Sequence, residues 1–509
     1  MLADADGRTD VLFELAEAGK NVWVHEPRPL IRRPRERNIS SHVDLSKADG
    51  TFFLENVYFG RNMAGVKPGE VKKLLIVESL PKPVNFTGGM DPMSYSGTFS
   101  LERVLGAVPV EADGSAHFTA PALRSLFFVA LDERGRSVKR MQSFTGVQPG
   151  ETVGCVGCHE HRTRPRSTVS GEPVQAARRA PSPIAPFAGV PDLPDFSRDV
   201  QPILDRHCLP CHGVDKRSGG VLLTGDRGPM FSHSYYTLTI RRQLADGRNH
   251  ARNNYPPRAL GSGGSALMDK IDNHHNKVAL SPAERQTVLL WLEIGAPYPG
   301  TYAALGTGSI GGYEHNSQHL HNDARWPTTL AAQPVFARRC NSCHAGKTAI
   351  PHTLSDEIGL SFWRPDMNDP RLPHARHIVF NLTRPDKSLI LLAPLARSAG
   401  GYGICVPKDS AKTRNAAKAD DKKPDAAVFT SRDDADCKLL LAMVQAGKAR
   451  LDEIKRFDMP GFRPRPEYVR EMIRYGLLPE GFDPAKTPLD VYQMDRKYWQ
   501  SLWYRPPGS

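Results

Sequence analysis

Residues 200–213 have the sequence VQPILDRHCLPCHG, and residues 332–345 have the sequence AQPVFARRCNSCHA. The two segments share a Gln-Pro pair, an apolar pair, an arginine and a Cys-x-x-Cys-His motif in the same order. A third copy of the motif, CVGCH, begins at Cys155. Six of the eight cysteines therefore belong to three copies of one five-residue motif.

The Cys-x-x-Cys-His pattern is typical of covalent haem attachment, in which the thiols form thioethers and the adjacent histidine binds the iron. Zinc would need four ligands in clustered pairs, but the first cysteines of successive motifs are far apart in sequence, at 155, 208 and 340. A redox-active dithiol would need neither the histidine nor three copies. The sequence predicts three covalently bound haem c cofactors, held by Cys155, Cys158 and His159, by Cys208, Cys211 and His212, and by Cys340, Cys343 and His344.

The second and third motifs also share features beyond their immediate surroundings. The segment 264–268, GSALM, resembles the segment 387–391, KSLIL. Duplication of a one-haem unit would explain both similarities. A chance likeness between two helices that enter a haem motif is the alternative.

The sixth iron ligand separates an electron carrier from a site that binds substrate. For the second motif, His274 and His275 stand in the loop that should cover the haem. We expect His275 to be a metal ligand beside His212, and the alternative is a pair of surface histidines. Two histidine ligands would give a low potential and an electron-transfer role.

The other two motifs leave the sixth ligand open. His161 follows the first motif too closely to reach over the iron, so a five-coordinate, reactive haem is a hypothesis there, while His159 and His344 are expected as the iron ligands of their own motifs. For the third motif the candidates for the sixth ligand are His315, His319, His321, Met367, His374 and His377.

The pattern of apolar residues predicts an α+β multidomain chain, with a β-rich N-terminal domain followed by mainly α-helical, cytochrome c-like haem domains. Residues 126–131 and 137–144 are typical of a β-hairpin, and Ser281-Pro-Ala-Glu284 is a capping box that opens a helix. The expected parts are a remnant of an upstream β domain (1–30), the β-rich domain with the first motif (31–162), a linker (163–195), a unit with the second motif (196–305), and a unit with the third motif and a C-terminal extension (306–509), which contains a flexible insertion (406–428).

Net charge and hydropathy indicate which classes of partner the protein could bind. The formal charge is +12, but no interleaved basic and aromatic pattern indicates nucleic-acid binding. Haem propionates would offset roughly half of this charge, and the remainder could steer an acidic redox partner protein. Arg162, Arg164 and Arg166 either pair with propionates or belong to a solvated linker. No apolar run is long enough to predict a membrane span.

Haem c attachment predicts a periplasmic or other non-cytoplasmic location. The first 15 residues, MLADADGRTDVLFEL, have no apolar core of an export signal. We expect that the given chain begins inside a longer protein or that its start lies upstream. In an exported protein, Cys405 and Cys437 are candidates for a disulfide that closes the insertion, with two free buried thiols as the alternative.

Three segments carry a resemblance to a known family. The segment from Gly106 to Glu160, GAVPVEADGSAHFTAPALRSLFFVALDERGRSVKRMQSFTGVQPGETVGCVGCHE, resembles the middle domain of the hydrazine synthase alpha subunit. Residues 196–213, FSRDVQPILDRHCLPCHG, resemble planctomycete-type cytochrome c domains. NLTRPDKSLILLAPLARSAGGYGIC and IKRFDMPGFRPRPEYVREMIRYGLLP resemble the C-terminal part of the same multihaem cytochrome family.

The resemblance implies an amino-terminal β-propeller, of which residues 1–30 would be the last remnant. In the family, the first haem is catalytic, a tyrosine four residues after the motif histidine is its axial ligand, and zinc lies nearby. This chain has Thr163 at that position. We therefore predict electron transfer as the function and keep a haem oxidoreductase acting on a small nitrogen species at the first haem as the alternative. A subunit role in a larger complex is a third hypothesis, and no catalytic residue is assigned.

Overall fold

Two compact units make up the chain, Met1–His42 and Val43–Ser509. In the first unit, strand β1 (Leu2–Ala3) pairs antiparallel with strand β2 (Thr9–Asp10). Most of the predicted domain remnant at residues 1–30 lies outside the described residues. The computed structural model describes residues 2–3, 6, 8–10, 41–84, 93–95, 97, 99–158, 173–245, 254–305, 323–405 and 427–508.

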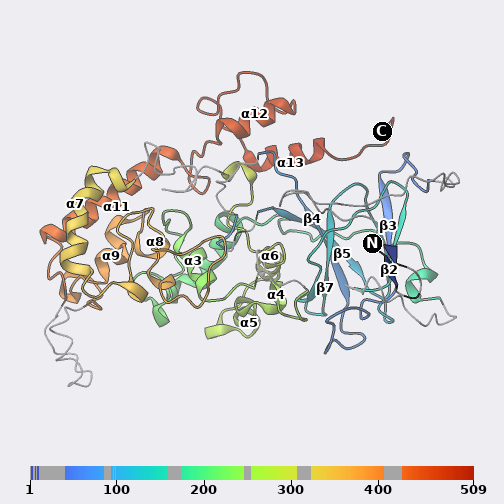
Figure 1. Ribbon diagram of the computed structural model, residues 1–509, viewed down its shortest axis with the longest axis horizontal. Coiled ribbons are helices and arrows are strands. Elements are labelled where there is room, and N and C mark those ends of the chain that lie inside the picture. Colours follow the sequence, from blue (N-terminus) through green and yellow to red (C-terminus); the bar gives the residue numbers. More distant parts are fainter. Residues whose placement is uncertain are drawn as a thin grey trace. The chain divides into compact units, whose positions relative to one another are not determined.

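Two β-sheets form the first part of the second unit (Figure 1). The smaller sheet has the strand order β6-β3-β9, and β9 runs parallel to β3. The larger, antiparallel sheet has the order β5-β4-β7-β8. The strands are β3 (Asp49–Leu54), β4 (Lys73–Ser79), β5 (Glu102–Pro109), β6 (Ala116–Pro121), β7 (Leu126–Leu131), β8 (Ser137–Arg140) and β9 (Thr152–Cys155).

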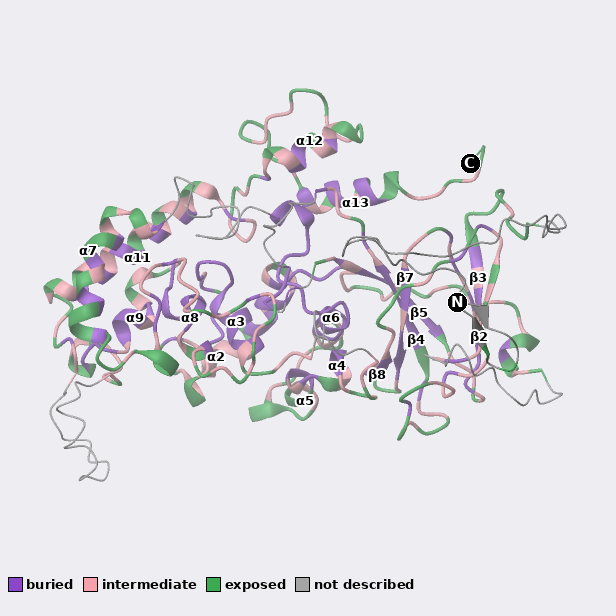
Figure 2. Ribbon diagram, in the orientation of Figure 1, coloured by how far each residue is buried: buried purple, intermediate pink, exposed green. Residues whose placement is uncertain are grey.

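Strand β4 is buried on both faces, and it contributes side chains to the core of the β-rich part and to the core of the helical part (Figure 2). Leu74 and Ile76 belong to a core shared with the smaller sheet. Leu75 and Val77 point the other way, because side chains alternate along a strand, and they belong to the core that extends into the helical half. The β-rich part therefore shares its main apolar core with the helices.

Helices dominate the chain after the β-rich part, so the predicted α+β order is confirmed. The predicted hairpin forms between β7 and β8, and the predicted capping box opens α6, with both reciprocal hydrogen bonds present at Ser281 and Glu284. The helices are α1 (Gln201–His207), α2 (Leu209–His212), α3 (His233–Ile240), α4 (Gly261–Gly264), α5 (Ala266–Asp272), α6 (Pro282–Glu293), α7 (Pro327–Val335), α8 (Arg376–Val379), α9 (Leu389–Leu392), α11 (Ala435–Ile454), α12 (Pro466–Arg474) and α13 (Val491–Ser501).

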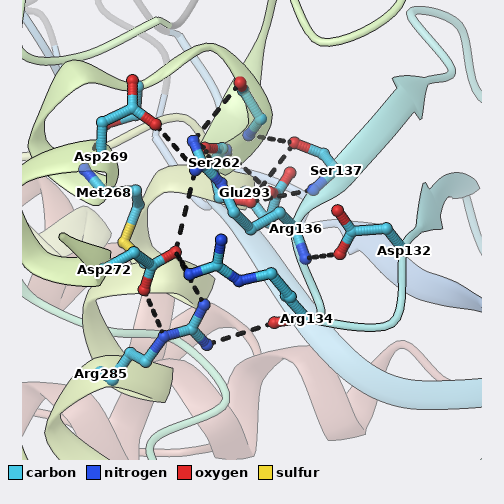
Figure 3. Close-up of polar contacts among 12 residues, drawn as sticks. Asp132, Arg134, Arg136, Ser137, Ser262, Met268, Asp269, Asp272, Arg285 and Glu293 are labelled. Carbon is cyan, nitrogen blue, oxygen red and sulfur yellow. Dashed lines mark hydrogen bonds and ion pairs between the residues drawn. The ribbon is translucent and has the colours of Figure 1, made fainter.

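The turn between β7 and β8 docks on helices α4 to α6 through a charged network (Figure 3). The guanidinium of Arg136 donates to Asp269 at 2.7 Å and to the Ser262 carbonyl at 2.7 Å. Asp272 accepts two hydrogen bonds from Arg285, at 2.7 and 3.1 Å, and lies 3.3 Å from Arg134. This contact places the β-rich domain against the unit that carries the second motif.

The described part of the predicted linker, residues 173–195, packs along both sheets. Backbone hydrogen bonds join Ala185 to Ala107 of β5, and a bridge joins Ser182 to Phe118 of β6. Ala176 is fully buried. The predicted insertion at 406–428 lies almost entirely outside the described residues.

The C-terminal helix α13 returns to the β-rich domain. The indole N–H of Trp499 donates to the Pro81 carbonyl at 3.2 Å, and the Tyr498 hydroxyl donates to the Lys82 carbonyl at 3.3 Å. Within the described part of the chain, each helix is too short or too polar to cross a lipid bilayer.

Candidate functional site

The second and third motifs adopt the same backbone turn. The His212 N–H donates to the Cys208 carbonyl at 3.0 Å, and the His344 N–H donates to the Cys340 carbonyl at 2.9 Å. In such a helical turn, residues three and four positions apart share a face. Both thiols and the histidine of each motif therefore lie on one side, as attachment to one planar group requires.

The motif histidines are held by the same kind of secondary contact. The Nδ1 atom of His212 lies 3.2 Å from the Ser218 carbonyl, and Nδ1 of His344 lies 2.9 Å from the Thr348 carbonyl. A carbonyl can only accept, so Nδ1 carries the proton and Nε2 has its lone pair available for a metal. This is the tautomer that an axial iron ligand needs.

A second imidazole faces His212. The ring centres of His212 and His275 are 6.4 Å apart, and the ring planes are inclined by 15°. Two imidazoles that bind one metal ion from opposite sides, each at about 2 Å, have ring centres roughly 6 Å apart. The separation of the two ring centres is therefore compatible with His212 and His275 as ligands of one metal ion.

The two histidines of that loop differ in their contacts. Nδ1 of His274 lies 3.2 Å from the Val278 carbonyl of its own loop. The His275 ring is exposed, and the Asn276 amide lies 2.9 Å from its Nε2 atom. The Nε2 atom of His275 therefore contacts a neighbouring side chain, whereas His274 contacts a backbone carbonyl.

The third motif also has a facing histidine. The ring centres of His344 and His374 are 6.0 Å apart, and their planes are inclined by 76°. His377 is instead fully buried, with its ring against Tyr95 and Tyr236, and Met367 lines a separate cavity of about 230 Å³. The remaining candidates, His315, His319 and His321, lie outside the described residues.

Burial favours the neutral form of one histidine at each of the two sites. It lowers the pKa of His212 and of His374, and in each case the facing histidine lowers it further. Neutral imidazole is the form that binds a metal. Burial also raises the pKa of the Cys208 and Cys340 thiols to about 11, so neither is activated as a thiolate for a dithiol exchange site.

The first motif has a different backbone. Cys155 ends strand β9, and its carbonyl accepts a hydrogen bond from the Glu55 N–H at 2.9 Å. A Cβ atom on Gly157 would overlap the Phe59 carbonyl, so only glycine fits at position 157. His159 and Thr163 lie outside the described residues, as do His161, Arg162, Arg164 and Arg166.

Lys139 is a buried cation near this motif that the sequence did not single out. Its ammonium donates to the carbonyls of Asn62, at 3.1 Å, and Tyr255, and to Oδ1 of Asn254 at 2.8 Å. Burial lowers its pKa, and the nearby Cys158 opposes this effect. A single lysine in a strand gives no sequence signal, because its position depends on the loop at 254–255.

The expected disulfide between Cys405 and Cys437 is wrong. Both cysteines are free. Cys405 instead lies near the third motif, where its thiol interacts electrostatically with Cys340 and Cys343. Cys437 is buried in α11. Over the described ranges, no group of three or more His, Cys, Asp and Glu side chains forms a conventional metal site.

Comparisons with known proteins found similarities to parts of this chain. The structure of Kuenenia stuttgartiensis hydrazine synthase is similar over 50% of this chain and 44% of that chain, with 18% sequence identity and a TM-score of 0.38. This chain thus spans less than half of that one, and no curated protein matches. Residues 69–160, which contain β4 to β9 and the first motif, match the family model of the hydrazine synthase alpha subunit middle domain.

Proposed function

We propose that this protein is a multihaem c-type cytochrome that transfers electrons in an exported redox system. The observation that carries the proposal is the His212–His275 pair, which has the separation expected for two axial ligands of one iron. A five-residue motif and a loop more than 60 residues later supply the two rings. A surface pair of histidines without a ligand would have no reason to keep this separation.

The residues that would hold the cofactors are those of the three motifs. Cys208 and Cys211 would form the thioethers at the second motif, with His212 below the iron and His275 above it. Haem iron supplies reversible one-electron transfer. With both axial positions filled by histidine, substrate has no open coordination position, which favours an electron carrier.

The partners that fit this function are redox proteins. The formal charge of +12 favours an acidic partner through long-range attraction, and this attraction weakens as the salt concentration rises. From the chemistry of haem c attachment we infer a periplasmic or other non-cytoplasmic location. Assembly as a subunit of a larger redox complex fits the family match of residues 69–160.

A second function is favoured by the first motif. This motif lies within residues 69–160, which match the hydrazine synthase alpha middle domain. It begins at the end of strand β9, whereas the other two motifs follow helices. The alternative is therefore a haem oxidoreductase that acts on a small nitrogen species at this motif, with the second and third haems as electron carriers.

A spin-state-resolved redox titration of the holoprotein separates the two functions. Electron transfer alone predicts three covalently bound haems that are all low-spin and unchanged by carbon monoxide. The alternative predicts one high-spin haem whose visible spectrum shifts with carbon monoxide and which survives mutation of the other two motifs. A holoprotein without covalent haem at Cys208 and Cys211 would overturn both.

A further inference from the structure

The facing histidine pairs of the second and third motifs differ in orientation. The rings of His212 and His275 are nearly parallel, at 15°, whereas those of His344 and His374 are crossed, at 76°. The motifs themselves have the same backbone turn and the same Nδ1 contact to a carbonyl. The difference therefore arises from the distal histidine.

The distal histidines come from different places in the repeated unit. The related segments both begin a helix behind a serine, Ser265 before α5 and Ser388 before α9. His275 follows Ser265 by ten residues, and the position ten residues after Ser388 is Ser398. The third unit has no histidine at that position, and His374 precedes α9 instead.

The two distal histidines also have different surroundings. His275 is exposed and contacts the Asn276 amide. His374 is half-buried, and its Nδ1 atom is buried without a hydrogen-bond partner among the described residues. An axial imidazole whose other nitrogen donates no hydrogen bond is a weaker donor to the metal.

We propose that His374 is the distal ligand at the third motif and that the crossed geometry makes this the higher-potential site, so that electrons pass from the second site to the third. The inference rests on the proposed function. With haem bound, parallel histidine rings would donate to the same iron d orbital and stabilise iron(III), whereas crossed rings would divide their donation. Burial of His374 would act in the same direction, because a less polar environment disfavours the more positive iron(III) state. With both irons bound, one electron would pass from iron(II) at the second site to iron(III) at the third, and no proton or bond would be transferred.

A short segment connects the two motifs directly. The Tyr402 hydroxyl donates to the Val214 carbonyl at 3.1 Å, two residues after His212. Three residues further on, Cys405 interacts with Cys340 and Cys343 of the third motif. The segment from Tyr402 to Cys405 therefore contacts the chain just after the second motif and ends near the third.

Electron paramagnetic resonance of the oxidised holoprotein tests the inference, combined with a potentiometric titration of each signal. We expect a rhombic low-spin signal from the second site and a highly anisotropic low-spin signal with one large g value from the third. The anisotropic signal should disappear first as the potential is lowered. His374→Ala should remove this signal alone, and the matched control Met367→Leu should leave it unchanged.

The outcomes distinguish this inference from the proposed function. If the third-site signal is rhombic, is reduced after the second, or persists in His374→Ala, the inference is overturned while the second-site signal still supports an electron carrier. If the rhombic signal is also absent, the proposed function fails. Covalent haem content and unfolding temperature, measured for each variant, show whether His374→Ala still folds and retains the third haem.

Discussion

The imidazole rings of His212 and His275 face each other with their centres 6.4 Å apart, although 63 residues separate them in the chain. The first ring is positioned by the turn from Cys208 to His212, and the second by the loop between α5 and α6. Their separation depends on how α5 and α6 pack beside the motif. Contacts between distant segments therefore control the coordination of the predicted iron.

Replacing His275 with alanine should convert the second haem from low spin to high spin. The side chain is exposed, so the change should have little effect on folding. Visible absorption and electron paramagnetic resonance of the holoprotein measure the spin state. His274→Ala is the matched control and should remain low-spin, because His274 contacts its own loop. Equal effects of the two substitutions would exclude His275 as the ligand.

Replacing Asp272 with asparagine should destabilise the contact between the β7–β8 turn and α5–α6 (Figure 3). The Asp272 side chain is only 3% exposed and accepts hydrogen bonds from Arg285. Losing its charge should lower the free energy of unfolding by about 2 kcal/mol. Asp269→Asn is the control, because that side chain is 58% exposed, and should cost less than about 1 kcal/mol. Chemical denaturation compares the variants, and similar losses for both would contradict this account.

The arginines lower the pKa of Asp272, so its contribution to stability depends on pH. A carboxyl with a lowered folded-state pKa stabilises the fold above its unfolded pKa, and this stabilisation is lost as the pH falls through the folded value. The stability difference between the wild type and Asp272→Asn should therefore shrink in acid. A constant difference between pH 7 and pH 3 would show that the charge of Asp272 is not responsible.

Asp495 should have the opposite pH dependence. Burial raises its pKa to about 6, although it accepts hydrogen bonds from Tyr468, Thr301 and the Tyr302 N–H. A raised pKa means that the folded state binds the proton more tightly, so this group's contribution to stability is present at low pH and is lost as the pH rises through 6. From an ordinary value of 3.8, at about 1.4 kcal/mol per pKa unit, the effect approaches about 3 kcal/mol.

The variant Asp495→Asn removes this titration. Its unfolding temperature relative to the wild type should rise between pH 4.5 and pH 7.5, because only the wild type must then bury a charge or keep its proton. Circular dichroism melts at both pH values measure the difference. A difference that is independent of pH, or that falls over this range, would contradict the assignment.

Cys405 and Cys437 should both be titrated as free thiols in the unfolded, unreduced holoprotein, because no disulfide joins them. In the folded protein Cys437 should react slowly, since it is buried. Labelling with iodoacetamide followed by peptide mass analysis identifies the modified residues. Protection of both thiols in denaturant without a reductant would instead indicate a disulfide.

The sequence by itself determined the features that depend on near neighbours. The three Cys-x-x-Cys-His motifs, the Ser281–Glu284 capping box and the β7–β8 hairpin involve residues a few positions apart, where hydrogen-bond geometry follows from residue type. The preference for His275 over His274 stays a prediction, because both histidines stand in the same loop. The α+β order followed from the change in apolar periodicity along the chain.

Only the tertiary structure showed that the ring of His374 lies beside that of His344, with the planes inclined by 76°, and that Cys405 lies near the third motif rather than beside Cys437. It also placed Lys139 by the loop at 254–255 and packed Gly157 against Phe59. These relationships join segments whose separation in space is determined by how strands and helices share a common apolar core. A sequence specifies which side chains can bind a metal, whereas the packing of distant elements determines which of them face each other, and at what angle.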